Sequence, residues 1–361
     1  MLDRTIAIEY MYTILKRFGT ENTMATLKDV AKLAGVSIGT ASSALNRHSG
    51  VKESTRKKVL EAASLLNYRP NGAARDLKTQ KTDTIGVFLH DLAGPFYSEL
   101  IRGIQDVADE YEYATIASRG GKGRNTSWTR LFVEGRVDGA IVLDPTVPDE
   151  VIRSTVGPTL PIVLLDRILD VPYCLHVAAD HEGGAYEVTK HLLESGIRRI
   201  AFVSGPSDSH DSNLRFRGYK RSLEEFGIEL DHSLIYRGDF TEGSGALVAR
   251  AMLSRDDLPG GVFAANDEMA LGFIHGCESS DIIVPDQIAV VGFDDIIVAS
   301  YVNPALTTVR QPMYELGVVA ARNLFRTIRG EKDISPVILP TQVIIRDSSK
   351  GHVRTFGSVH V

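Results

Sequence analysis

Three short helical segments are predicted between residues 26 and 66, where apolar residues recur every three or four positions. Thr26 and Ser37 stand directly before the first two segments, and their hydroxyls are suited to capping a helix N-terminus. Gly35 ends the first segment and Asn46 the second, and a third is expected to begin with Ser54 as its cap. Two helices joined by a glycine-containing turn, with a third helix bracing them, follow the helix-turn-helix plan.

From residue 84 the pattern changes to apolar stretches that alternate with amphipathic ones. Strands are predicted at 84–89, 114–117, 138–143, 161–166, 199–204, 234–236, 261–265 and 288–293. Helices are predicted between most of them, at 95–112, 182–195, 216–226, 243–253 and 268–277. Apolar strands alternating with helices indicate doubly wound parallel sheets. About 265 residues of this pattern exceed one open sheet, so we expect an α/β body with two lobes of periplasmic-binding-protein type behind the small all-α head.

Two segments outside these patterns have separate interpretations. Residues 1–23 are expected to be a disordered or non-native leader, and the alternative is a short accessory helix over 6–18. Residues 70–82 contain Pro70 and Gly72, which interrupt a helix, but Ala73–Leu77 can form a single turn. An isolated helix of that length is marginal in water, so its order is expected to depend on what it contacts.

Charge is distributed unevenly along the chain. Residues 1–81 contain 14 Lys and Arg against 7 Asp and Glu, whereas the remaining 280 residues contain 26 against 39. A small basic head on an acidic body indicates that the head meets a polyanion such as DNA. A basic terminus can also be ordinary solvated surface, and helical domains of this plan occur in proteins that do not bind DNA. The excess of 11 basic over 4 acidic residues between 24 and 81 favours DNA.

Cysteine content and hydropathy exclude two classes of protein. The only cysteines, Cys174 and Cys277, are far apart, which excludes a disulfide scaffold and a cysteine-based zinc site. We expect both to be reduced, buried thiols of a cytoplasmic protein. No apolar run approaches the ~18 residues that cross a bilayer, so no membrane partner is expected.

Polar residues follow several predicted strands at the point where each strand ends. Asp166, Asn266 and Asp294 come directly after apolar strands, and His90 and Asp91 follow the first strand. In doubly wound folds ligands bind beyond the carboxyl ends of the strands, so these side chains could converge on one cleft. Carboxylates and an amide suit a polyhydroxylated or small polar ligand. The alternative is that each Asp or Asn simply caps the following helix.

Motifs of several enzyme classes were sought in the body. There is no P-loop G-x-x-x-x-G-K-[ST], no H-E-x-x-H, and no G-x-G-x-x-G after the first strand. Gly120-Gly121-Lys122-Gly123 resembles a phosphate-binding loop in composition alone, and a flexible loop is expected there. The ten histidines have no metal-like spacing. We therefore expect no enzyme activity, no catalytic residue, no metal site and no cofactor.

A set of motifs, in the order head then body, carries a family likeness. In the head they are the segments 26–37, 67–71 and 74–77. In the body they include Pro95-Phe96-Tyr97, Arg215-Phe216-Arg217-Gly218-Tyr219, Ala265–Gly272, Val291-Gly292-Phe293-Asp294-Asp295 and Leu306–Gln311. These segments resemble the LacI/GalR family of bacterial transcription regulators over residues 25–348. The resemblance implies a sequence-specific DNA-binding regulator, expected to be a repressor, whose body is similar to periplasmic sugar-binding proteins.

The resemblance places the helix from Ser37 to Asn46 in the major groove of DNA. The DNA contacts that it implies are Thr26, Ser37, Ile38, Gly39, Thr40, Ser43, Asn46, Asn71, Ala74 and Leu77. Many relatives carry Arg or His where this chain has Ser43, which leaves open how the outer bases of the operator are read. Leu77 is implied to enter the minor groove at the operator centre, and the alternative is that it packs on the body.

The resemblance also implies a set of effector contacts in the body. They are Phe96, Tyr97, Asp166, Arg215, Phe240, Asn266, Asp294 and Gln311. Arg217 is a second candidate for the family's effector arginine, because the spacing of Arg215 and Arg217 admits either. The implied effector is a small polar molecule, a sugar or sugar derivative, bound between the two lobes. Whether it releases or promotes DNA binding stays open.

The expected organisation has five parts. They are a leader at 1–23, a helix-turn-helix domain at 24–69, a hinge helix and linker at 70–82, an effector-binding and dimerisation body at 83–348, and a tail at 349–361. The first lobe is expected at about 83–178 and 310–337, and the second at about 179–309 and 338–348. One head reads half a site, so we expect a homodimer on a palindromic operator of double-stranded DNA. The rival hypothesis is a solute-binding protein of a sugar transporter, which has no basic head.

Overall fold

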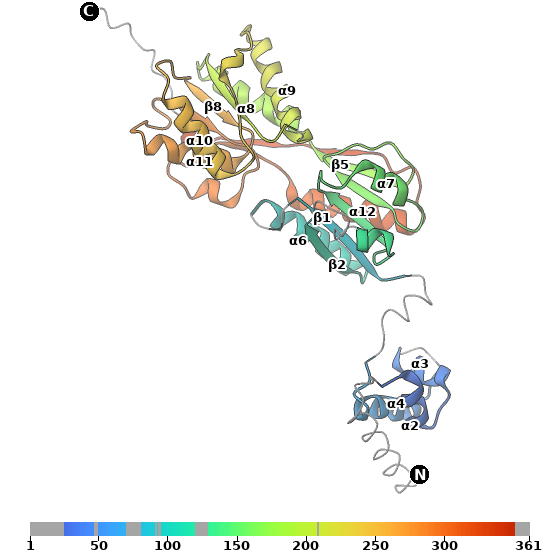
Figure 1. Cartoon of the computed structure of the whole chain (residues 1–361). Coiled ribbons are helices and arrows are strands. Elements are labelled where there is room, and N and C mark those ends of the chain that lie inside the picture. The colour runs from blue at the N-terminus through green and yellow to red at the C-terminus, as the bar shows by residue number, and fades with distance from the viewer. Residues whose placement is uncertain are drawn as a thin grey trace, which may run out of the picture. The chain divides into compact units, whose positions relative to one another are not determined.

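The computed structural model describes residues 25–46, 50–69, 81–90, 92, 95–119, 129–207 and 209–350. The expected leader, the hinge segment and the tail beyond residue 350 therefore lie outside the described residues. The chain divides into two compact units, residues 1–80 and 81–361, which are described separately (Figure 1). This division falls within the predicted linker.

The head contains the three predicted helices, α2 (Leu27–Ala34), α3 (Ile38–Leu45) and α4 (Glu53–Leu65). Thr26 forms a capping box with Asp29, and the Ser37 hydroxyl accepts a hydrogen bond from the Thr40 amide. Gly35 ends α2 with a φ of 68°, a left-handed conformation that glycine adopts without steric cost. The prediction that Ser54 caps α4 is wrong. The helix begins at Glu53 with Lys52 at the capping position, two residues earlier than expected, so Ser54 already lies within its first turn.

Small apolar side chains form the core of the head. Val30, Ala31, Ala41, Val59 and neighbouring alanines of the three helices are buried against one another. Alanines let the helices approach closely, which suits a domain with little volume for a core. Arg56 of α4 also donates a hydrogen bond of 2.9 Å to the carbonyl oxygen of Ala44, near the C-terminal end of α3.

The first lobe of the body is built on a six-stranded parallel sheet in the order β11-β5-β4-β3-β1-β2. Its strands are β1 (Thr84–Leu89), β2 (Ala114–Arg119), β3 (Gly139–Leu143), β4 (Ile162–Leu165), β5 (Cys174–Ala179) and β11 (Val337–Leu339). Its helical elements are α6 (Pro95–Glu110), η1 (Thr129–Val133), α7 (Asp149–Thr155) and α12 (Met313–Ile328). Ile85 and Val87 of β1 enter the core with α6 and α12, whereas Phe88 enters a separate core on the opposite face.

The second lobe has a four-stranded parallel sheet in the order β7-β6-β8-β9. Its strands are β6 (Ile200–Ser204), β7 (Ile235–Arg237), β8 (Gly261–Ala264) and β9 (Ala289–Val291). Its helices are α8 (His181–Glu194), α9 (His210–Glu225), α10 (Glu242–Leu253) and α11 (Asp267–Glu278), with short turns η2 (His232–Leu234), η3 (Ile297–Ser300) and η4 (Asp347–Ser349). Helices α8 and α9 cover one face of this sheet and α10 and α11 the other (Figure 1). The predicted fold class is confirmed.

The chain passes between the lobes three times. It crosses from β5 to α8, returns from β10 (Thr308–Arg310) to α12, and crosses again from β11 to β12 (Gln342–Ile344). Strands β10 and β12 pair with each other as an antiparallel ribbon. Because β11 belongs to the first sheet, Ile338 and Leu339 lie in the first lobe and not in the second, where we expected them.

Helices α6 and α12 approach each other most closely at two glycines. A Cβ on Gly103 would lie 2.2 Å from the carbonyl oxygen of Tyr314, and one on Gly317 would lie 2.3 Å from that of Leu100. Both obstacles are backbone atoms, which cannot move without shifting a helix. Any larger side chain at these positions must therefore separate the two helices.

We expect Gly103→Ala to lower the free energy of unfolding of the body by ~1–3 kcal/mol, because the added methyl group overpacks this crossing. Chemical denaturation followed by circular dichroism measures the change. The matched control is Gly243→Ala in α10, where the new Cβ meets only the Thr241 hydroxyl at 3.9 Å. That variant should be unchanged or up to ~1 kcal/mol more stable. Equal stability of both variants would contradict the prediction.

Candidate nucleic-acid interface and effector site

The start of α3 presents several of the predicted DNA contacts. Ser37, Ile38 and Gly39 are exposed, and Thr40 is partly buried one residue further on. Ile38 is 50% exposed although it is apolar. Leu60 and Leu65 of α4 are also exposed, but Ile38 alone of the three stands at the start of α3. An apolar side chain at the N-terminus of a recognition helix can contact the methyl group of thymine.

The remaining predicted DNA contacts are distributed around this surface. Thr26 and Asn46 are exposed and Ser43 is partly buried. Asn71, Ala74 and Leu77 lie outside the described residues. Gly35–Gly39 also fits the G-x-S-x-G spacing of serine hydrolases, but Ser37 follows a helix instead of a strand. Its hydroxyl lies 2.8 Å from the Thr40 hydroxyl and caps α3.

In the second lobe the predicted effector residues gather around the guanidinium of Arg215. Arg215 projects from α9 and is only 2% exposed. Its Nη1 lies 3.4 Å from Asp294 Oδ1, and its Nη2 lies 3.5 Å from Asp211 Oδ2. The guanidinium also lies 4.0 Å from the ring centre of Phe293. Arg217, the alternative arginine, is exposed and pairs with Glu182, so Arg215 is the one the structure places in this cluster.

Asp294 joins this cluster to the segment that crosses to the first lobe. Its Oδ1 accepts a hydrogen bond of 2.7 Å from Gln311 Nε2, just before α12 begins. Burial raises the pKa of Asp294 well above its usual value, and the opposing charge of Arg215 limits the rise. Gln311 is 4% exposed, and its Oε1 is buried without a hydrogen-bond partner among the described residues.

Asp166 reaches the same cluster from the first lobe. Its Oδ1 accepts a hydrogen bond of 3.1 Å from the Ala179 amide and lies 2.9 Å from His181 Nε2, at an angle unsuited to a hydrogen bond. His181 is 1% exposed, and its Nδ1 accepts from the Arg215 Nε at 3.4 Å. His181 therefore stands between Asp166 and Arg215. No local pattern in the sequence marks His181, which is the first residue of α8.

Backbone conformation also marks three of the predicted residues. Asp166, Phe240 and Asp294 have φ values of 52°, 69° and 127°, in the left-handed region that non-glycine residues seldom occupy. Such conformations cost free energy and are concentrated at functional sites.

Asn266 fits both interpretations of polar residues at strand ends. Its Oδ1 caps α11 by accepting a hydrogen bond of 3.0 Å from the Met269 amide. Its Nδ2 donates a hydrogen bond of 2.9 Å to the Phe240 carbonyl oxygen, which fixes the loop that carries Phe240. At the first strand, His90 Nδ1 lies 3.9 Å from the buried Asp144, and Asp91 lies outside the described residues.

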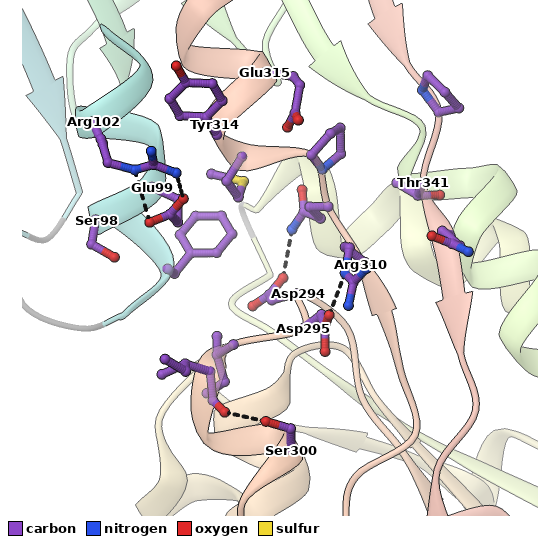
Figure 2. Close-up of a pocket in the computed structure, with 18 of the residues that line it drawn as sticks. Ser98, Glu99, Arg102, Asp294, Asp295, Ser300, Arg310, Tyr314, Glu315 and Thr341 are labelled. Atoms are coloured by element: carbon purple, nitrogen blue, oxygen red, sulfur yellow. Dashed lines mark hydrogen bonds and ion pairs between the residues drawn. The ribbon is translucent and has the colours of Figure 1, made fainter. Parts of the chain in front are cut away.

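A cavity of 790 Å³ opens beside Asp294 and Gln311 and is lined by both lobes (Figure 2). Phe96 lines it from α6, and Tyr97 packs edge-on against Phe96 at 5.0 Å. Of the eight predicted effector residues, Phe96, Asp294 and Gln311 line this cavity. The other five, Tyr97, Asp166, Arg215, Phe240 and Asn266, do not line it. Asp294 connects the residues that line the cavity with the cluster around Arg215, because it contacts both Gln311 and Arg215.

Within the described part of the chain, no group of three His, Cys, Asp or Glu side chains is arranged to hold a metal ion. No helix there is long and apolar enough to cross a membrane.

Comparisons with known proteins agree with this architecture. The sequence model described as "Bacterial regulatory proteins, lacI family" matches residues 26–71, and that of the "Periplasmic binding protein-like domain" matches residues 189–349. Catabolite control protein A of Priestia megaterium is 38% identical over 329 residues, which cover 90% of this chain and 99% of that protein. The chain belongs to the LacI family of bacterial regulatory proteins.

Two solved structures of the LacI family show the same fold. One, titled as a lac repressor dimer bound to operator and the anti-inducer ONPF, has a TM-score of 0.78 and 30% identity, covering 91% of this chain and 99% of its own. The other, a complex of the regulator CelR with cellobiose, has a TM-score of 0.67 and 33% identity, covering 90% and 99%. The prediction of a LacI-family transcriptional regulator is thus confirmed over that of a transporter's solute-binding protein.

Asp267, next to the effector cluster, gives the second lobe a specific pH dependence. Burial raises the pKa of Asp267 to about 7, although the Thr308 hydroxyl and the Ile296 amide donate hydrogen bonds to it. The native state therefore holds a proton that the unfolded state releases between about pH 4 and pH 7. The free energy of unfolding should fall as the pH rises through this range and level off above it.

We expect Asp267→Asn to flatten this part of the stability profile, by up to about 1.4 kcal/mol per pH unit, because asparagine does not titrate. Asparagine can still accept from the Ile296 amide, so the fold should be kept. Urea unfolding at pH 4.5, 5.5, 6.5 and 7.5 provides the measurement. If both proteins show the same slope between pH 4.5 and 6.5, Asp267 is not the buried acid that titrates.

Proposed function

We propose that this LacI-family regulator represses transcription from a palindromic operator and that a small polar effector, a sugar or sugar derivative, controls its affinity for DNA. The observation that carries the proposal is the hydrogen bond between Asp294 and Gln311 beside a cavity lined by both lobes. A ligand that contacts either side chain acts on the connection between the lobes. Ligand binding that favours one arrangement of the lobes changes the population of the DNA-binding state.

Two of the solved structures support a sugar or sugar derivative as the effector class. The CelR structure holds cellobiose, and the lac repressor structure holds the anti-inducer ONPF together with its operator. That lac repressor structure contains a dimer bound to operator, and we propose a dimer here as well, located in the cytoplasm where DNA is accessible. The proposal assigns no catalytic role to the body.

For the head we propose that α3 enters the major groove and reads bases with its first turn. Gly39 offers no side chain, and Ser43 cannot form the bidentate contact with guanine that an arginine makes. Exposed Ile38 therefore supplies the largest side chain in the first turn of this helix. Leu77, in the segment outside the described residues, is proposed to enter the minor groove.

We expect Ile38→Ala to weaken operator binding by ~1–3 kcal/mol and to leave binding to random DNA nearly unchanged, because base contacts carry specificity and phosphate contacts do not. Fluorescence anisotropy with operator and random duplexes, at one salt concentration, measures both affinities. Leu60→Ala in α4 is the control, since Leu60 is apolar and similarly exposed. Equal losses on the two duplexes would show that Ile38 does not read bases.

Asp294→Ala should abolish the effector response and leave operator binding intact. Removing this carboxylate takes away an acceptor for the ligand and for Gln311, and the loss of a buried hydrogen bond costs ~1–3 kcal/mol. Operator titrations with and without a panel of sugars measure the response. Asp294→Asn keeps an acceptor for Gln311 and should retain part of it. An unchanged response of the alanine variant at the same sugar concentration would refute the role of Asp294.

A further inference from the structure

Asp211 is an acid of the effector cluster that no motif identified. It lies in the first turn of α9, one helical turn before Arg215, and its Oδ2 is 3.5 Å from Arg215 Nη2. The Ser209 hydroxyl donates a hydrogen bond to its Oδ1. Burial opposes ionisation, but the charge of Arg215 and this hydrogen bond hold the pKa of Asp211 below its usual value. The Asp211 side chain is still 30% exposed, so an ionised carboxylate lies at the accessible edge of the cluster around Arg215.

The hydrogen-bond donors of the cluster are largely committed to protein acceptors. Arg215 has five N–H groups, and its three nitrogens face the Ala265 carbonyl oxygen, His181 Nδ1 and the carboxylates of Asp211 and Asp294. Asn266 and Gln311 each donate one of their two N–H groups, to Phe240 and to Asp294. His181 Nδ1 serves as an acceptor for Arg215, because a guanidinium can only donate.

Several hydrogen-bond acceptors of the cluster, by contrast, receive no hydrogen bond from the described residues. Gln311 Oε1 is buried and has no partner among the described residues. The Oδ2 atoms of Asp166 and Asp294 receive no hydrogen bond from any described residue, since the donors to both side chains reach Oδ1. A ligand that satisfies these oxygens must bring hydrogen-bond donors of its own.

The charge of the site also favours a ligand without a negative charge. Asp211 and Asp294 flank the guanidinium of Arg215, and Asp166 lies beyond His181, so the acids of the cluster outnumber its one guanidinium. The adjoining cavity is lined by four carboxylates and three guanidiniums. Those guanidiniums are already paired, Arg102 with Glu99 and Arg310 with Asp295 (Figure 2). Arg346 also pairs with Asp295. No arginine there is free to bind a phosphate or a carboxylate of the ligand.

We propose that the effector is an uncharged, donor-rich polyhydroxylated molecule, and that Asp211 makes the site reject the phosphorylated or acidic forms of the same sugar. The inference rests on the proposed effector site and adds the charge class of its ligand. An anionic group placed beside Asp211 meets a like charge in a partly buried site, where screening is weak. Arg215 does not offset this repulsion, because its donors face Asp211 and Asp294 already.

The test compares neutral sugars with their anionic partners on the full chain by isothermal titration calorimetry. The three pairs are ribose with ribose 5-phosphate, glucose with glucose 6-phosphate, and glucose with glucuronate. Cellobiose is added as a neutral sugar without an anionic partner. We expect one or more of the neutral sugars to bind, and we expect the anionic partner of each to bind at least about tenfold more weakly. In Asp211→Asn the ratio of neutral to anionic affinity should shrink by about tenfold, since one negative charge is removed.

Glu229→Gln is the matched control. It removes the same charge from an exposed residue beyond the C-terminal end of α9, a helix of 16 residues, and should leave the ratio unchanged. Operator binding by each variant reports that it is folded. If Asp211→Asn does not fold, the affinities of the wild-type protein for the neutral and anionic sugars decide. An anionic member that binds as tightly as its neutral partner overturns this inference but keeps the effector site. If no member of either class binds, the proposed effector site itself falls.

Discussion

The effector site is organised around one buried guanidinium. Arg215 cannot be deprotonated, so burying it at the start of the second lobe requires acids and carbonyl oxygens on every side. Asp211, Asp294, the Ala265 carbonyl oxygen and His181 meet this requirement, and the ring of Phe293 covers one face. These partners come from α8, α9 and the ends of β8 and β9. The position of one charge therefore fixes how four elements meet.

The connection between the lobes follows from the same cluster. Asp294 and Gln311 lie on either side of the ribbon strand β10, and His181 begins the helix that follows the first crossing. His181 and Asp294, which contact Arg215, and Gln311, which binds Asp294, are thus attached to chain segments that pass between the lobes. A ligand that changes the partners of Asp294 or Asp166 acts on those segments directly. This arrangement gives the regulator a physical route from ligand to lobe movement.

The sequence predicted most of the fold because its signals are local. The caps Thr26 and Ser37 and the glycine at position 35 set the first two helices of the head, and apolar runs located eight of the strands. Helix α9 is an element whose start these local signals did not predict. It was expected from Phe216 but begins at His210, because its first turn is polar and has no apolar repeat. Strand β5 and the three-residue strands β10, β11 and β12 were also not predicted, and three residues are too few to show a periodic pattern.

The sequence by itself determined the head, the two-lobed α/β body, and the acids at the strand ends, because these depend on spacing along the chain. Only the tertiary structure decided what those acids do. It showed that Asn266 caps a helix while it holds the Phe240 loop, that Asp267 is buried, and that Asp211 and His181 face Arg215. Most of these contacts join residues 26 to 41 positions apart, and the others depend on which face of a helix is buried. Such information resides in packing, and no local pattern of residues contains it.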